Sequence, residues 1–297
     1  MKKLLLSAFV ICLAGTSIAQ ESPLWMRHCA LSPDGTTIAF TYKGDIYTVP
    51  STGGRATQIT TNPAFDTEPV WSPDSKQIAF ASDRMGSLDV FVVSSEGGAP
   101  QRLTTHSGSE KPVAYKDNKH ILFTANIAPS AEDAGFPSGQ FQQVYEVAVT
   151  GGRPAMFSSM PMECISINKE GVMLYQDKKG YEDYWRKHQV SPIARDIWTY
   201  TPGKKPVYQK QTTFGGEDRE PVWSPDGKSF YYLSEEKGSF NIFQRTPGTT
   251  TSQQITFHTK HPVRFLSIST TGTLCYGYDG EIYTLTPGTV SYTHLRA

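Results

Sequence analysis

A repeated unit of about 40 to 45 residues constrains the fold of this chain more than any other feature. Its clearest copy spans residues 68–105, where four short runs rich in Val, Ile, Phe and Trp are separated by Pro, Asp and Gly. Such runs are typical of β-strands, and the residues between them are typical of tight turns. One unit therefore predicts one four-stranded antiparallel sheet.

The first turn of the unit recurs along the chain. The best copies are residues 32–35 (Ser-Pro-Asp-Gly), 72–75 (Ser-Pro-Asp-Ser) and 224–227 (Ser-Pro-Asp-Gly), and the eroded copies are residues 116–119, 168–171 and 269–272. Proline presets φ at the second position of a type I turn, aspartate can accept a bond from a nearby N–H, and glycine supplies a left-handed last residue. Six copies of one hairpin turn predict six sheets.

The third strand of the unit recurs as a polar residue followed by a β-branched and an aromatic residue. Its copies are Asp45-Ile46-Tyr47, Asp89-Val90-Phe91, Val144-Tyr145, Asp196-Ile197-Trp198, Asn241-Ile242-Phe243 and Glu281-Ile282-Tyr283. Radially packed sheets need apolar side chains at one register in every sheet. We therefore predict an all-β fold, a six-bladed β-propeller of four-stranded antiparallel blades over residues 20–288.

The two ends of the chain differ from the repeats. Residues 1–19 have a basic start, an apolar stretch too short to favour a membrane span, and Ser17-Ile18-Ala19 before the expected cleavage site at Gln20. These features predict a cleaved signal peptide, a periplasmic or secreted location and no membrane anchor. Residues 289–297 are expected to be a non-native tail on a fragment of a longer gene product.

The last blade is expected to be incomplete, because residues 286–297 replace the usual Gly-Gly turn and fourth strand. Alternatively, residues 290–294 could alternate as an edge strand. Residues 20–29 suffice only for the innermost strand of the first blade. We therefore expect the first and last blades to meet through side chains alone.

The residues that usually carry chemistry are scattered. The chain has 28 Lys+Arg and 28 Asp+Glu residues, so it lacks the excess of positive charge that is typical of nucleic-acid-binding proteins. The sequence has no Gly-x-Ser-x-Gly stretch and no phosphate-binding glycine loop. His258 and His261 are three residues apart, but we expect them to be solvated loop residues rather than metal ligands. We therefore predict no catalytic, cofactor-binding or metal-binding residue in this chain.

Three cysteines follow the signal segment: Cys29, Cys164 and Cys275. Their wide spacing and odd number give neither a disulfide framework nor a zinc-binding pattern. We expect them to be small buried apolar residues. Two of them could pair only if two blades brought them within bonding distance.

Two blades carry long inserts between their second and third strands, at residues 126–141 and 177–195. In an up-down blade this junction lies on the same face of the ring as the crossovers between blades. Long loops are often functional, and aromatic residues and arginine often anchor contacts. The candidates for contact with a peptide or partner are Phe136, Tyr181, Tyr184, Trp185 and Arg186. Alternatively, these aromatic residues pack the inserts onto the ring.

The Trp-Ser-Pro-Asp-Gly turns, the Ile-Ala-Phe strands and the Asp-Ile-Tyr strands resemble the WD40-like repeats of the TolB, prolyl oligopeptidase and tricorn protease families. Three features resemble the tricorn group and its secreted bacterial relatives: a ring directly behind the signal, six blades, and residues 184–198, which look like the corresponding fourth blade. The resemblance covers about residues 23–286.

This resemblance implies that a second propeller, a PDZ module and a serine peptidase core follow the ring in the full-length protein. The ring would then guide or filter peptide substrates, and all catalytic residues would lie beyond residue 297. The implied partners are peptides and the downstream domains of the same chain, and the resemblance also allows a homo-oligomer.

The alternative is a non-catalytic, TolB-like propeller that binds envelope proteins. TolB-like chains place an α/β domain before the propeller, and the residues between Ala19 and Ala30 leave no room for one. A prolyl oligopeptidase relative would usually need seven or eight blades and a downstream Gly-x-Ser-x-Gly domain.

Overall fold

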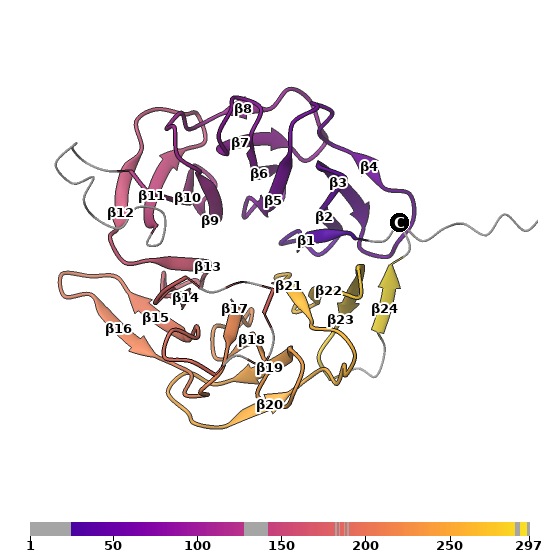
Figure 1. Cartoon of the computed structure of the whole chain (residues 1–297). Coiled ribbons are helices and arrows are strands. Elements are labelled where there is room, and N and C mark those ends of the chain that lie inside the picture. Colours follow the sequence, from indigo (N-terminus) through magenta and orange to yellow (C-terminus); the bar gives the residue numbers. More distant parts are fainter. Residues whose placement is uncertain are drawn as a thin grey trace, which may run out of the picture.

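The computed structural model describes residues 25–127, 142–181, 183, 185, 186, 188, 190–288 and 292–295. Their strands form six four-stranded sheets arranged around one axis (Figure 1). Strands that follow one another in a blade pair antiparallel, so the predicted all-β six-bladed propeller is confirmed. Among these residues, no helix is long and apolar enough to cross a membrane. The predicted signal peptide lies outside the described residues.

The first three blades have these bounds. Blade one contains β1 (Arg27–Leu31), β2 (Thr37–Tyr42), β3 (Asp45–Pro50) and β4 (Thr57–Gln58). Blade two contains β5 (Asp66–Trp71), β6 (Gln77–Ser82), β7 (Asp89–Ser94) and β8 (Gln101–Arg102). Blade three contains β9 (Lys111–Asp117), β10 (His120–Ala125), β11 (Gln143–Ala148) and β12 (Ala155–Ser158).

The last three blades follow the same order. Blade four contains β13 (Met162–Ile167), β14 (Met173–Asp177), β15 (Ile197–Thr201) and β16 (Val207–Lys210). Blade five contains β17 (Asp218–Trp223), β18 (Phe230–Ser234), β19 (Asn241–Arg245) and β20 (Ser252–Gln254). Blade six contains β21 (Arg264–Ile268), β22 (Leu274–Tyr278), β23 (Glu281–Leu285) and β24 (Tyr292–Leu295).

The repeat contributes three strands to blade six, as the prediction of an incomplete last blade requires. The fourth position is taken by β24, which comes from residues outside the repeat and pairs antiparallel with β23. Most of residues 290–294 therefore do contribute an edge strand, which is the alternative that the sequence left open.

The Ser-Pro-Asp-Gly segments form the predicted hairpin turns between the first and second strands. Gly35 N donates to Ser32 O over 2.8 Å, and Gly35 has a φ of +77°. The Asp34 carboxylate accepts hydrogen bonds from the Ser32 hydroxyl at 2.6 Å and from Thr36 N at 3.0 Å. The same bonds recur in the turns at residues 72–75 and 224–227. These aspartates therefore stabilise the turns, as the sequence predicts.

The third strand of every blade carries the predicted β-branched and aromatic residues. The β-branched residues are at most 1% exposed: Ile46, Val90, Val144, Ile197, Ile242 and Ile282. Each aromatic residue lies opposite an aromatic residue of the second strand, as the pairs Phe40–Tyr47, Phe80–Phe91, Phe123–Tyr145, Tyr175–Trp198, Tyr232–Phe243 and Tyr276–Tyr283. Such cross-strand pairs fix the register of each blade.

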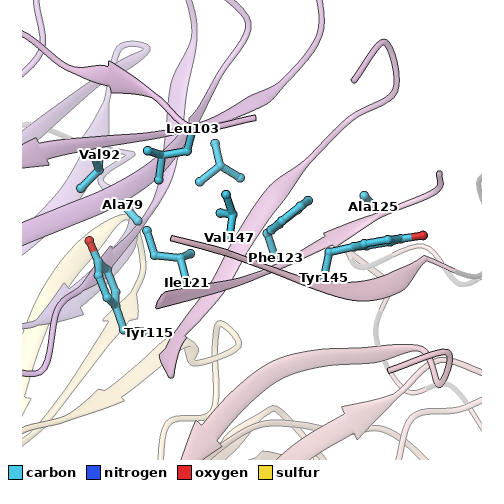
Figure 2. Packing of buried hydrophobic residues seen from close by; sticks show 10 residues of the cluster. Ala79, Val92, Leu103, Tyr115, Ile121, Phe123, Ala125, Tyr145 and Val147 are labelled. Carbon is cyan, nitrogen blue, oxygen red and sulfur yellow. The ribbon is translucent and has the colours of Figure 1, made fainter. Parts of the chain in front are cut away.

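Apolar side chains from neighbouring blades pack face to face. Figure 2 shows this between blades two and three, where Ala79 and Val92 face Ile121 and Val147. A lone sheet would expose both apolar faces to water, so the ring stabilises its blades collectively.

Backbone hydrogen bonds also join neighbouring blades. An N–H at or just before the start of an innermost strand donates to the carbonyl just before the third strand of the preceding blade. The bonds are Asp66 to Gly44 (2.7 Å), Glu110 to Leu88 (2.7 Å), Asp218 to Arg195 (3.0 Å), Val263 to Phe240 (3.0 Å) and Met26 to Gly280 (3.1 Å). The last of these bonds closes the ring between blades one and six.

A second backbone bond crosses the same closure on the opposite face, where Thr270 N donates to Pro33 O over 2.8 Å. The expectation that blades one and six meet through side chains alone is therefore wrong. The sequence did not reveal these bonds because they join residues about 240 positions apart that carry no recognisable pairing pattern.

Candidate functional site

The innermost strands β1, β5, β9, β13, β17 and β21 surround the axis of the ring (Figure 1). Each is the terminal strand of its sheet and pairs with one neighbour, so its other edge faces the axis. Strand edges of this kind present backbone N–H and C=O groups that can bind another extended chain. The axis is therefore the first candidate for a binding site.

Five of the six innermost strands contain a β-bulge with a non-glycine residue in the left-handed region. These residues are His28, Glu68, Cys164, Glu220 and Phe265, with φ between +50° and +60°. A left-handed non-glycine residue costs about 1 kcal/mol or more and persists only where the surroundings hold it. Because this conformation recurs at one repeat position, it is a regular feature of the innermost strands.

Blade three departs from this pattern. Pro112 stands at the equivalent position, after Lys111 and before Val113. The proline ring fixes φ near −65°, so this residue cannot adopt the left-handed conformation.

Side chains of the innermost strands connect neighbouring blades. The Lys111 ammonium lies 2.6 Å from the Glu68 carboxylate, and the rings of His28 and Phe265 lie 4.7 Å apart. Burial is the main cause that lowers the pKa of His28, so its imidazole is neutral at pH 7. These contacts give the axis a mixed lining of charged and apolar groups.

The Cys164 thiol does not have the surroundings of a nucleophile. Burial is the main cause that raises its pKa, and the carboxylates of Glu220 and Glu163 raise it further. The reactive form of cysteine is the thiolate, which a raised pKa suppresses. Among the described residues, no group of three or more His, Cys, Asp or Glu side chains is arranged to hold a metal ion.

The insert of blade four is held at its base by charged contacts. Lys179 Nζ contacts the carboxylate of Asp196 and the carbonyl of Ala194. Asp177 accepts a hydrogen bond from Asp196 N at 2.8 Å and another from Trp198 Nε1 at 2.9 Å. Both ends of the insert are therefore fixed to the rim of the ring.

A chain of alternating charges extends from this base into blade five. Glu163 contacts Lys178 at 3.1 Å and Arg195 at 3.2 Å, and Glu217 contacts Arg195 at 3.6 Å and Arg219 at 2.9 Å. Burial opposes ionisation of Glu163, but Arg195 and Lys178 outweigh it and hold its pKa below the ordinary value. The base of the insert is therefore held by a series of largely buried ion pairs.

The tip of the insert reaches the opposite side of the ring. The guanidinium carbons of Arg27 in blade one and Arg264 in blade six lie 5.2 Å and 4.5 Å from the Trp185 ring centroid. Blades one and four are opposite each other in a ring of six, so these contacts take the insert across the axis. His188 N also donates to Glu235 of blade five over 2.6 Å.

The structure places only some of the predicted contact residues. Phe136 and Tyr184 lie outside the described residues. Tyr181 is 78% exposed, Trp185 is 49% exposed and lies between two arginines, and Arg186 is exposed. Both alternatives for the insert therefore apply in part, since Trp185 packs onto the ring while Tyr181 faces solvent. Contact of these residues with a partner stays a prediction.

Sequence reasoning missed Arg27, Arg264 and Glu235. Arg27 and Arg264 share one repeat position, directly before the left-handed residue of their blades. This shared position is the signal that could have identified them. Their common partner, Trp185, belongs to an insert that has no counterpart in most blades.

Six four-stranded antiparallel blades with Ser-Pro-Asp-Gly turns define a WD40-like β-propeller. The family model described as the tricorn protease N-terminal beta propeller domain matches residues 23–291. The chain therefore belongs to this family.

Two curated relatives match the chain. Tricorn protease homolog 1 of Streptomyces coelicolor is 24% identical over 260 residues, which are 85% of this chain and 23% of that protein. An uncharacterized protein of Agrobacterium fabrum is 34% identical over 218 residues, or 68% of each chain. The chain thus spans about a quarter of the length of the tricorn homologue.

Solved structures show the same fold. The crystal structure of the tricorn protease matches with a TM-score of 0.76 and 17% identity, over 92% of this chain and 26% of that one. TolB from Acinetobacter baumannii matches with a TM-score of 0.66 and 15% identity, over 86% of this chain and 62% of that one.

Proposed function

We propose that this chain is the N-terminal propeller of a tricorn-like serine-type peptidase and guides extended peptides toward a peptidase core elsewhere in the full-length protein. The observation that carries the proposal is the insert of blade four, whose Trp185 lies against Arg27 and Arg264 across the axis. The serine-type activity is part of the proposal on the strength of the family to which the chain belongs.

The innermost strands suit an extended peptide. Their edges toward the axis carry backbone N–H and C=O groups, which are groups that extended chains can bond whatever their sequence. The bulges at His28, Glu68, Cys164, Glu220 and Phe265 interrupt five of the six innermost strands, so a bound peptide cannot extend those blades by a full strand. Binding that is broad in sequence and weak at any one strand is what a guiding path requires.

The binding itself is tested with this chain and an unstructured fluorescent peptide of about twelve residues. We expect saturable binding, with protection from amide hydrogen exchange in β1, β5, β9, β13, β17 and β21. A folded protein of similar composition is the control and is expected not to bind. Protection confined to the outer strands, or no binding, would overturn the proposal.

The Trp185→Ala variant tests the role of the insert. A cation–π contact at an exposed site contributes about 0.5–1 kcal/mol. Loss of both arginine contacts should therefore weaken the attachment of the insert to the ring by roughly 1–2 kcal/mol. We expect the peptide association rate, measured by stopped-flow anisotropy, to rise on the order of fivefold. The matched control is Tyr181→Ala in the same insert, which should stay within twofold of the original rate. Equal rates for both variants would show that the insert does not cover the mouth.

The alternative is a non-catalytic, TolB-like propeller that binds envelope proteins. The likeness to TolB supports it at the level of fold. In the same binding experiment this alternative expects capture of a folded envelope protein and no protection of the innermost strands by an extended peptide.

Export to the periplasm or the medium is part of the proposal. Residues 1–19 supply the basic and apolar segments and the small residues at Ser17 and Ala19 that a signal peptidase recognises. Expression of the chain in a bacterium is expected to yield a mature protein that begins at Gln20, as read by N-terminal sequencing. Recovery of uncleaved chain in the cytoplasm would contradict this prediction.

A further inference from the structure

Two cysteines meet where the ring closes. Cys29 lies in β1 of blade one and Cys275 in β22 of blade six, and they are 4% and 0% exposed. Both belong to one apolar cluster that spans the closure between blades one and six. The Cys29 thiol also donates to Phe265 O at 3.5 Å. The two cysteine side chains are therefore buried in the same cluster, one on each side of the closure.

The strands around the two thiols lie close together. Leu31 N in β1 donates to the Ser267 hydroxyl in β21 over 3.0 Å, and β1 packs against both β21 and β22. Cysteine has a short side chain, so two thiols can touch only where the two backbones approach each other closely. Disulfide formation would bring the two sulfurs to about 2.05 Å, between strands that already pack against each other.

We propose that Cys29 and Cys275 form a disulfide bond that closes the ring covalently when the folding chain meets a disulfide-bearing oxidant. Two thiols lose two protons and two electrons as the new S–S bond forms. The oxidant takes up the electrons and protons as its own disulfide is reduced to two thiols. Oxidised glutathione and the disulfide oxidoreductases of an exporting cell belong to this chemical class.

The timing of the reaction follows from the burial of the pair. Burial is the main cause that raises the pKa of the Cys29 thiol well above its ordinary value. Because the thiolate is the attacking species, the closed ring oxidises slowly. The bond is therefore expected to form as blades one and six come together, before the apolar cluster covers the two thiols.

The bond joins positions near the two ends of the described chain. A cross-link that closes a long loop restricts the unfolded chain strongly and stabilises the folded one. Cys164 lies in blade four, away from the closure, and serves as the internal control.

The first test maps the bond directly. The chain is refolded in a buffer of oxidised and reduced glutathione, alkylated, digested without reduction and analysed by mass spectrometry. We expect a linked peptide pair that contains Cys29 and Cys275, with Cys164 alkylated. Alkylation of both Cys29 and Cys275 after oxidative refolding overturns the proposal, and so does a link that involves Cys164.

The second test measures the stabilisation. Reduction of the oxidised protein with dithiothreitol is expected to lower its Tm by roughly 5–10 °C. Cys29→Ala and Cys275→Ala should each lose this dependence on the reductant, whereas Cys164→Ala should keep it. Equal Tm values with and without reductant overturn the proposal. Both tests use glutathione in vitro, so their outcome does not depend on peptide binding or on export.

Discussion

Replacement of Arg84 by methionine is expected to lower the free energy of unfolding by about 3–5 kcal/mol, because it leaves the charge of Asp66 buried without its partner. Arg84 Nη2 lies 2.9 Å from Asp66 Oδ2, and the Asp66 side chain is fully buried. Methionine keeps much of the apolar stem that packs near Phe91, so the variant removes mainly the charge. Urea unfolding at pH 7 measures the loss.

The matched control is Lys237→Met. Lys237 lies 3.7 Å from Glu236 at the equivalent loop of blade five, and its side chain is 62% exposed. Solvent screens such pairs, so the expected loss is below about 1 kcal/mol. A loss for Arg84→Met as small as that for Lys237→Met would show that Asp66 finds another way to satisfy its charge.

Asp218→Asn should have the opposite effect, even though Asp218 occupies the same repeat position as Asp66. In blade two, Asp66 lies opposite Ser82, and Arg84 follows two residues later. In blade five, Asp218 lies opposite Ser234, and Glu236 follows two residues later. Within the part of the chain that the structure describes, no Lys, Arg or His nitrogen lies within 4.0 Å of the Asp218 carboxylate. Burial is the main cause that raises the pKa of Asp218 to about 7.

The pH dependence follows from this raised pKa. The folded state holds the Asp218 proton up to about pH 7, whereas the unfolded chain releases it near the ordinary value of 3.8. The folded state therefore loses stability as the pH rises through this window, and the full cost is present above pH 7. Asparagine cannot ionise, so Asp218→Asn should gain roughly 2–4 kcal/mol at pH 8 and almost nothing at pH 4.

Urea unfolding of both proteins at pH 4, 6 and 8 measures the gain. Asp66→Asn is the matched control and should destabilise the protein at pH 8, since it leaves Arg84 unpaired. A gain from Asp218→Asn that is the same at pH 4 and pH 8 would contradict ionisation of the carboxyl group as its cause.

The sequence predicted those elements whose side chains obey local rules. The serine and aspartate side chains of the Ser-Pro-Asp-Gly turns bond to each other and to residues within five positions, so each copy is recognisable alone. The Ile-Tyr pairs of the third strands recur because every sheet must bury both faces. Together these two patterns determine the number and the order of the blades.

The innermost strands were harder to predict. The strand β5 begins at Asp66, but Glu68-Pro69 looks like loop sequence because a bulge there places Glu68 in the left-handed region. A sequence window shows no sign of such a bulge, since it is held by the neighbouring blades. Asp83-Arg84 illustrates the same limit: Asp83 accepts the backbone N–H of Phe65, whereas Arg84 pairs with Asp66, 18 residues earlier.

The contacts across the axis depend on the closed ring. Trp185 meets Arg27 and Arg264 only because opposite blades face one another, and Cys29 meets Cys275 only because blade six returns to blade one. Neither pair has a spacing that a local pattern could reveal. Candidate sites in such rings therefore come from the three-dimensional arrangement.

The backbone bonds between blades have a consequence for the order of folding. Asp66 N bonds to Gly44 O, and most other interfaces likewise join neighbouring stretches, so each blade can dock on its predecessor during synthesis. The contacts between blades one and six span 236 and 237 residues and must wait for the last repeat. Closure of this long loop is therefore the step most exposed to kinetic competition from aggregation.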